Sequence, residues 1–414
     1  MTGGAEPRAS FRGDSRFRWG VCVVLLLATV LNYLNRQVFS LTAEKVIAEF
    51  HTDKEGYGRL VAAFRYPYAA VQFFGGWLVD VFGPRLVFPS AVAVWSAATL
   101  LTARTRSFGG LAACRAMLGA GEAYNWPCAL ATTERLVEPR DKPFANGIFN
   151  SGTALGAILA PVVVTLLVTG GNWRSPFFLV GALGAVWIAL WMIVTRADKK
   201  RLAGGAVVLA DVPRQMLRIG CRREFWMLAT AAVVINGVSY IIADWIPLYL
   251  KVERGFGFAL GNSLSILAYV GLDLGNLLTG FSVRRAIAGG MAAGRARTAA
   301  LVACCACMSC SVAVGWVSSR YLALGGIVVA AVGVAGFLVI YLTAVQDLEP
   351  AHVGVTSGML GGLGNLIYGF LSPFIGRLWD RHDLTLLFAL TGILPWLAYV
   401  SIAPVMRKPA SPAP

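Results

Sequence analysis

Two ionisable residues stand seven positions apart inside an apolar stretch of the sequence. Arg115 and Glu122 lie within RAMLGAGEAYNWP. Seven residues are about two turns of an α-helix, so both side chains would project from nearly the same face. An ionisable residue inside a membrane costs about 2.5 to 3.5 kcal/mol on insertion scales, and it is expected to face water or an opposite charge. Because a carboxyl group changes its proton affinity when it meets a cation, the pair is a candidate proton-coupling site. A purely structural ion pair is the alternative.

The first two apolar stretches carry further polar residues. In the first stretch, Arg36 is either an interface residue that reaches toward water or a cation for an anionic solute, and Tyr33 precedes it by one turn. In the second stretch, Arg65, Tyr68 and Gln72 follow a spacing of three and then four residues, which places them on one helical face. The sequence therefore predicts a polar face with a cation, a phenol and an amide.

Polar residues also interrupt the later apolar stretches. Thr153 is the polar exception among small residues of the fifth stretch, and Asn365 lies in the eleventh. Asp244 and Asp273 lie in the seventh and eighth stretches. They add to the intramembrane negative charge, although Asp244 could instead be solvated near the outer membrane surface. Sequence alone does not say which of these charges pair.

The elements that must position these residues are membrane-spanning helices. The chain has 414 residues, of which 57% are hydrophobic and 14% are charged, against about 25% charged in an ordinary soluble domain. Apolar runs of about 20 residues recur along it, each long enough to cross a bilayer as a helix. The predicted fold is all-α, with spans near 19–43, 57–79, 85–103, 108–134, 143–169, 174–195, 224–250, 258–283, 298–317, 320–345, 352–376 and 384–405.

The longest connection divides these spans into two groups of six. It covers 196–223 and is rich in Arg and Lys. We expect two pseudo-symmetric halves, 19–195 and 224–405, around a site at the middle of the membrane. Short tails, 1–18 and 406–414, flank them. Basic residues concentrate in alternate loops, which predicts that the central loop and both tails lie in the cytoplasm.

Several other classes of function are disfavoured. The net charge of +15 lies mostly in short loops between apolar runs, so membrane topology explains it and no nucleic-acid partner is expected. Three His lie near predicted span ends and no nucleophile–base motif occurs, so we expect no enzyme and no cofactor. A membrane sensor would need an output domain, for which the N-terminal tail and the central loop are too short. No metal site is expected from the one Cys cluster, which lacks the flanking ligands of a zinc site: Cys304, Cys305, Cys307 and Cys310.

The loop after the second stretch reads GGWLVDVFGPRLV. This resembles the signature loop of the major facilitator superfamily, G-x-L-x-D-x-x-G-x-R/K, with matches at Gly76, Leu78, Asp80, Gly83 and Arg85. The resemblance implies a gating loop whose acidic residue pairs with neighbouring helix ends in one state and releases them in another.

Four more stretches narrow the resemblance: RAMLGAGEA, NGIFNSGTALGA, ADWIPLYLKVERGF and LDLGNLLTG. They are similar to the anion:cation symporter branch of that superfamily, and most of all to its hexuronate transporters. The resemblance implies proton-coupled symport of a sugar-acid anion, such as glucuronate or galacturonate, by alternating access in a bacterial inner membrane. It implies a small anionic solute and protons as partners, with Na⁺ not excluded, and a monomer in the lipid bilayer.

The resemblance also implies roles for individual residues. Arg36 would bind the substrate carboxylate, and Arg115 would couple to Glu122 as the proton-binding carboxyl. The remaining substrate contacts would come from Tyr33, Arg65, Tyr68, Gln72, Thr153 and Asn365.

Two departures from the branch bear on the substrate. Asn35 stands where galactonate transporters have an Asp, which removes one proton site, and Arg65 adds a cation. Since paired arginines suit phosphate recognition, Arg36 with Arg65 leaves open an organophosphate exchanger. Symport of another small organic anion also stays open.

Overall fold

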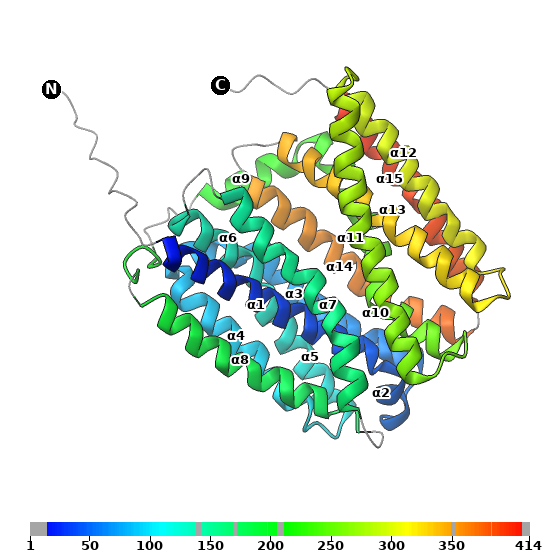
Figure 1. Ribbon diagram of the computed structural model, residues 1–414, viewed down its shortest axis with the longest axis horizontal. Helices are drawn as coiled ribbons and strands as arrows, with labels where there is room; N and C mark the ends of the chain where they lie inside the picture. Colours follow the sequence, from blue (N-terminus) through cyan, green and yellow to red (C-terminus); the bar gives the residue numbers. More distant parts are fainter. Residues whose placement is uncertain are drawn as a thin grey trace.

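Nearly all of the chain is helical in the computed structural model, which describes residues 15–137, 142–168, 172–196, 198–204, 211–348, 353–381 and 383–407 (Figure 1). No β-strand occurs within those ranges. The helices are α1 (Ser15–Leu41), α2 (Ala43–Glu49), α3 (Lys54–Phe82), α4 (Pro84–Thr102), α5 (Phe108–Glu122), α6 (Asn125–Leu136), α7 (Lys142–Leu167), α8 (Ser175–Val194), α9 (Asp211–Gly220), α10 (Arg223–Val252), α11 (Phe258–Ala288), α12 (Ala293–Val314), α13 (Arg320–Leu348), α14 (Val353–Asp380) and α15 (Leu384–Arg407).

Within the described ranges, these helices make twelve membrane crossings. Ten of them are individually long and apolar enough to span a bilayer: α1, α4, α7, α8 and α10 to α15. The other two crossings are α3, which carries several charged residues, and α5 with α6, which have 15 and 12 residues and are each too short alone. The chain is therefore an all-α membrane protein with six crossings on each side of the central connection, as the sequence predicts. We call α1 to α8 the first half and α10 to α15 the second half.

The fourth crossing is broken directly after Glu122, a feature that the sequence analysis missed. Pro127 has no N–H and cannot donate to the carbonyl of Ala123, so regular α-helical bonding fails there. The Tyr124 N–H bonds instead three residues back, to Gly121 O at 3.3 Å. The carbonyl of Glu122 accepts a hydrogen bond from Asn32 Nδ2 at 3.2 Å. The break thus fixes the end of α5 against α1 and positions the Glu122 side chain.

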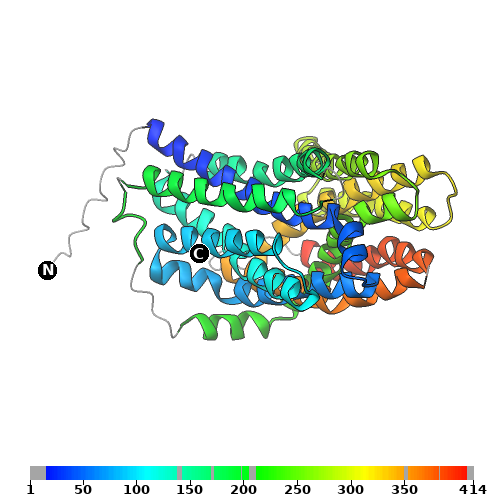
Figure 2. The ribbon, with the colours of Figure 1, turned by 90° about the horizontal axis from the view of Figure 1, so that it is seen from below.

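The two ends of the bundle differ. Figure 1 shows that α1 begins, α15 ends and α9 lies at one end, which we call the terminal end, while α2 lies at the opposite, far end. In Figure 2, α9 lies at the periphery of the bundle, where it contacts α10 and α14. The sequence predicts only a loop across 196–223, so α9 corrects that expectation. The expected tails fall almost entirely outside the described residues.

The halves meet along α3 with α14, α7 with α11 and α1 with α10. At the far end, ion pairs join them: Lys54 Nζ lies 3.1 Å from Glu253 Oε1, and Arg377 Nε lies 3.0 Å from Glu55 Oε2. Lys251 Nζ also donates to the carbonyl of Leu41 at 2.6 Å. These contacts hold the halves together at the far end in this structure.

Candidate functional site

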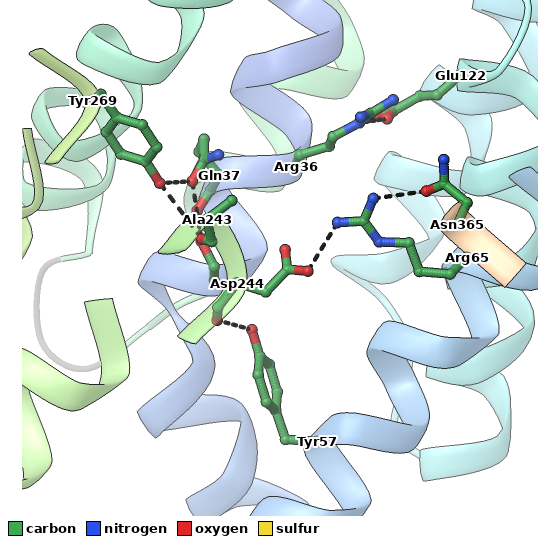
Figure 3. A network of polar contacts seen from close by, with 10 residues as sticks. Arg36, Gln37, Tyr57, Arg65, Glu122, Ala243, Asp244, Tyr269 and Asn365 are labelled. Atoms are coloured by element: carbon green, nitrogen blue, oxygen red, sulfur yellow. Dashed lines mark hydrogen bonds and ion pairs between the residues drawn. The ribbon is translucent and has the colours of Figure 1, made fainter. Parts of the chain in front are cut away.

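Arg36 and Glu122 form a buried ion pair between α1 and α5 (Figure 3). Arg36 Nε donates to Glu122 Oε2 at 2.7 Å, and the side chains are 14% and 0% exposed. The other carboxylate oxygen, Glu122 Oε1, is buried without a hydrogen-bond partner among the described residues. Arg36 is therefore an interior cation, and the alternative of an interface residue reaching toward water is wrong.

Aromatic rings surround the Arg36 guanidinium. Its Cζ lies 4.6 Å from the Tyr68 ring centroid, 5.2 Å from that of Phe64 and 5.3 Å from that of Tyr33. Ring faces at such distances attract a cation. The site therefore stabilises the positive charge by cation–π contacts while an anion occupies the remaining side.

Arg65 forms a second buried ion pair, which crosses between the halves. Its Nη2 lies 2.9 Å from Asp244 Oδ2 on α10, and its Nη1 donates to Asn365 Oδ1 on α14 at 2.9 Å. Its Cζ stacks 3.7 Å from the Tyr240 ring centroid and 5.1 Å from that of Tyr368. The Asp244 side chain is only 15% exposed, so the alternative in which it is solvated near the outer surface is wrong.

Amide side chains extend this network. Asn365 Nδ2 donates to Gln72 Oε1 at 2.9 Å, which connects α14 to α3. Nearby, the Tyr269 hydroxyl of α11 donates to Gln37 Oε1 of α1. Figure 3 shows the bond between Tyr269 and Gln37 beside the two arginines. Residues far apart in the sequence thus converge at the contact between the halves.

Arg115 does not form the expected ion pair with Glu122. Its Cζ lies 4.1 Å from the Phe39 ring centroid and 4.7 Å from that of Phe64. Its Nε and Nη1 are buried and have no hydrogen-bond partner among the described residues. The prediction of the partner is therefore wrong: the helix turn brings the residues to one face, but the carboxylate points to Arg36. We call Arg36, Arg65, Arg115, Glu122 and Asp244 the central cluster.

Three other predicted polar positions lie outside this cluster. Asn35 is buried and accepts a hydrogen bond from Thr99 Oγ1 of α4 at 3.0 Å. Thr153 and Asp273 are partly buried on α7 and α11, and no hydrogen bond or ion pair within the described ranges joins them to the cluster.

The signature loop binds parts of the first half to one another. Arg85 donates to the carbonyl of Thr195, at the end of α8, and to its Oγ1 at 3.0 Å. Asp80 Oδ1 lies 3.9 Å from Arg135 Nη2 on α6. Gly83 has a φ of +77°, which favours glycine at the turn between α3 and α4. Gly76 is exposed on α3. The release of these contacts in another state remains a prediction.

Sequence reasoning missed several residues at the site, among them Phe64. Phe64 lies within 6 Å of all three arginines of the cluster, measured from its ring centroid to each Cζ. A single phenylalanine in an apolar stretch carries no signal of such a role. Tyr240 had a signal, because it lies one helical turn before Asp244. Within the described residues no group of three or more His, Cys, Asp or Glu could hold a metal ion.

Comparison with known proteins identifies the family. Residues 25–367 match the model of the Major Facilitator Superfamily. The chain belongs to the major facilitator superfamily. A crystal structure of a D-xylose-proton symporter superposes with a TM-score of 0.75 at 14% identity, covering 95% of this chain and 98% of that one. The two proteins therefore share their overall fold.

Relatives in this superfamily include hexuronate transporters. The hexuronate transporter of Escherichia coli (strain K12) is 26% identical over 281 residues, which are 64% of this chain and 64% of that protein. The match thus spans less than two thirds of that relative. The hexuronate transporter of Bacillus subtilis (strain 168) is 25% identical over 419 residues, covering 96% of this chain and 97% of that protein. The chain is thus similar to the Bacillus subtilis hexuronate transporter along nearly its whole length.

Proposed function

We propose that this protein is a secondary active transporter that carries a sugar-acid anion, a hexuronate such as glucuronate or galacturonate, into the cell together with a proton. The observation that carries the proposal is the buried Arg36–Glu122 pair, held at 2.7 Å beside Tyr33 and Tyr68. A guanidinium that already binds one carboxylate can bind another of the same geometry. The similarity to hexuronate transporters supports the choice of solute.

Competition for Arg36 couples the solute to the proton. While Glu122 is ionised, it occupies the guanidinium that the substrate carboxylate needs. When Glu122 takes a proton, its attraction to Arg36 weakens and the substrate replaces it. The unpaired Oε1 is a position for that proton. Binding of the anion and of the proton therefore favour each other.

Alternating access follows from the contacts between the halves. The terminal end lies in the cytoplasm, as the basic loops indicate, and the far end faces the outside of a bacterial inner membrane. Breaking the Lys54–Glu253 and Glu55–Arg377 pairs opens the far end. Gln72 and Asn365 meet the hydroxyl groups of the solute, and the signature loop around Asp80 controls the cytoplasmic side.

Energetics favour the coupling to a proton. An inside-negative potential opposes entry of an anion by about 2.3 kcal/mol per charge per 100 mV. One accompanying proton cancels this charge. Each pH unit of gradient then supplies about 1.4 kcal/mol, which is a tenfold accumulation.

The test is uptake of labelled glucuronate into proteoliposomes with imposed pH and voltage gradients. Glu122→Gln removes the proton site and keeps the side-chain size, so we expect it to abolish pH-driven accumulation and to keep exchange of solute for solute. Asp383→Asn, at an exposed carboxylate near the start of α15, is the control and should behave as wild type. Accumulation by Glu122→Gln equal to wild type would contradict the role of Glu122.

A second candidate is exchange of an organophosphate. It is favoured by the proximity of Arg36 and Arg65, whose Cζ atoms lie 5.2 and 5.5 Å from the same Phe64 ring centroid. Two guanidinium groups suit a phosphate. Competition of glucuronate uptake by sugar acids and by sugar phosphates distinguishes the two candidates. Replacement of the pH gradient by a Na⁺ gradient tests the coupling ion.

A further inference from the structure

The central cluster contains two separate positions at which a guanidinium binds a carboxylate. At the first, Arg36 Nε lies 2.7 Å from Glu122 Oε2, and at the second, Arg65 Nη2 lies 2.9 Å from Asp244 Oδ2. Both arginines contact the Phe64 ring, at 5.2 and 5.5 Å from its centroid, so their Cζ atoms are less than 11 Å apart. One solute of moderate size can therefore reach both.

The second position changes when the halves separate. Arg65 belongs to α3 in the first half and Asp244 to α10 in the second, and the Arg65 side chain is 4% exposed. Opening the far end would pull the two charges apart. A buried charge that loses its partner destabilises a protein strongly. In the open state an anionic group of the solute can take the place of Asp244 beside Arg65.

We propose that a second acidic group of the solute compensates Arg65, so that the preferred substrate is an organic dianion with one acidic group at each end. This inference rests on the proposed function, in which a hexuronate binds this site, and adds that a dianionic sugar acid binds the same site more tightly. One acidic group binds Arg36 in place of Glu122, and the other binds Arg65 in place of Asp244. Asn365, which contacts Arg65 at 2.9 Å, and Gln72 donate to the hydroxyl groups between them.

Charge balance predicts that protons bind together with the solute. Glu122 faces Arg36 and is near Arg115, while Asp244 faces Arg65 and its carbonyl accepts from the Tyr57 hydroxyl at 3.0 Å. The net charge of the central cluster is the same with and without bound solute when each negative charge on the solute binds together with one proton. The two displaced carboxylates are the sites for those protons. A dianion would therefore enter with two protons and a monoanion with one.

The experiment compares two solutes that differ at one end. Galacturonate has one carboxylate, and galactarate has the same hydroxyl stereochemistry with a carboxylate at both ends. Uptake of each labelled acid into proteoliposomes is measured for wild type, for Arg65→Gln and for Arg59→Gln. Arg59 lies on the same helix but its side chain is 64% exposed and pairs with Glu55, so it serves as the matched control.

We expect wild type to take up galactarate in preference to galacturonate. Arg65→Gln should lower galactarate uptake by about tenfold to a hundredfold, because the lost hydrogen bonds to a charged group contribute about that factor to binding. Galacturonate uptake should change by less than about threefold, and Arg59→Gln should leave the preference unchanged. Each pH unit of gradient should raise the accumulation of galactarate about a hundredfold, whereas it should raise that of galacturonate about tenfold.

Other outcomes would overturn the inference in distinguishable ways. If Arg65→Gln lowers the uptake of both acids equally, Arg65 only holds the halves together. If a sugar phosphate, with both charges at one end, competes better than galactarate, the two arginines bind one group. If Arg65→Gln does not fold, Asp244→Asn keeps Arg65 and should preserve the preference for galactarate; loss of that preference contradicts the inference. If wild type takes up neither acid, the proposed function itself fails.

Discussion

The two buried ion pairs of the central cluster use the same chemical groups but connect different parts of the protein. Arg36–Glu122 joins α1 to α5, both in the first half, whereas Arg65–Asp244 joins α3 to α10 across the halves. The first pair can break by a change of protonation without movement of the halves. The second must break when the halves separate at the far end. The position of a pair relative to the moving parts therefore decides whether it senses the proton or the conformation.

The largest expected effect is a difference in transport between variants of Arg36 and variants of Glu122, the two members of the first pair. Arg36→Gln should lower both accumulation and exchange by more than about 100-fold. It removes the anchor for the solute and leaves Glu122 as an uncompensated buried charge, a loss of about 3 to 5 kcal/mol. Glu122→Gln should remove accumulation alone. Both activities are measured in proteoliposomes with labelled glucuronate.

Arg36→Lys is the control for this effect. It keeps the charge but offers a point charge in place of the planar fork of donors, so activity between those of wild type and Arg36→Gln is expected. Exchange by Arg36→Gln close to that of wild type would show that the solute carboxylate binds elsewhere.

A smaller effect, on the opening of the far end, is expected when the Arg65–Asp244 pair between the halves is changed. Ser372 is fully buried on α14, beside Gly58 of α3 near the far end. Asp244→Asn removes one bond that holds the halves together, so it should speed the labelling of Ser372→Cys by a membrane-impermeant maleimide by about tenfold. This corresponds to a loss of about 1.4 kcal/mol from the closed state.

Glu122→Gln is the matched control, because it changes a pair inside one half and should leave the labelling rate within about twofold. The background carries Ser in place of the exposed Cys221 and Cys310 and the partly exposed Cys307. Equal acceleration by both variants would contradict the distinction between the pairs.

The sequence predicted the helices well because a bilayer imposes a simple requirement. Each crossing needs about 20 apolar residues, and α4 and α8 appear almost where their apolar runs lie. The short helices α2 and α9 were missed because each is too short to cross a membrane. The break after Glu122 was missed because Pro127 can also be accommodated inside a continuous membrane helix.

The site was only partly predictable. Polar residues in apolar runs identified Arg65 and Glu122 as interior groups, whereas Arg36 and Asp244 were left between an interior position and one near the membrane surface. Their pairing was not predictable, since it depends on how helices far apart in the sequence pack. Spacing along one helix suggested Arg115 as the partner of Glu122, but packing of α1 against the end of α5 placed Arg36 there instead.

The smallest effect is expected at an ion pair of the same residue types outside the membrane-spanning helices. Arg174 Nη1 lies 2.6 Å from Glu49 Oε2, beside a pocket of about 710 Å³ at the far end, yet the Glu49 side chain is 41% exposed. The hydrogen bond from Arg174 lowers the pKa of Glu49 below its ordinary value. The ionised carboxylate therefore stabilises the protein above the ordinary pKa, and this contribution disappears as the pH falls through the lowered pKa.

Glu49→Gln should accordingly lower the apparent Tm of the purified protein by less than about 2 °C at pH 7, because exposed pairs contribute at most about 1 kcal/mol. The difference from wild type should shrink as the pH falls below the ordinary carboxyl pKa of about 4.3, and it should vanish only below the lowered pKa of Glu49. Thermal unfolding across this pH range checks both values. The Arg174–Glu49 and Arg36–Glu122 pairs have the same charged groups at nearly the same distance and differ in burial. If Glu49→Gln lowered the Tm at pH 7 as much as Arg36→Gln does, burial would not be what makes one pair stronger than the other.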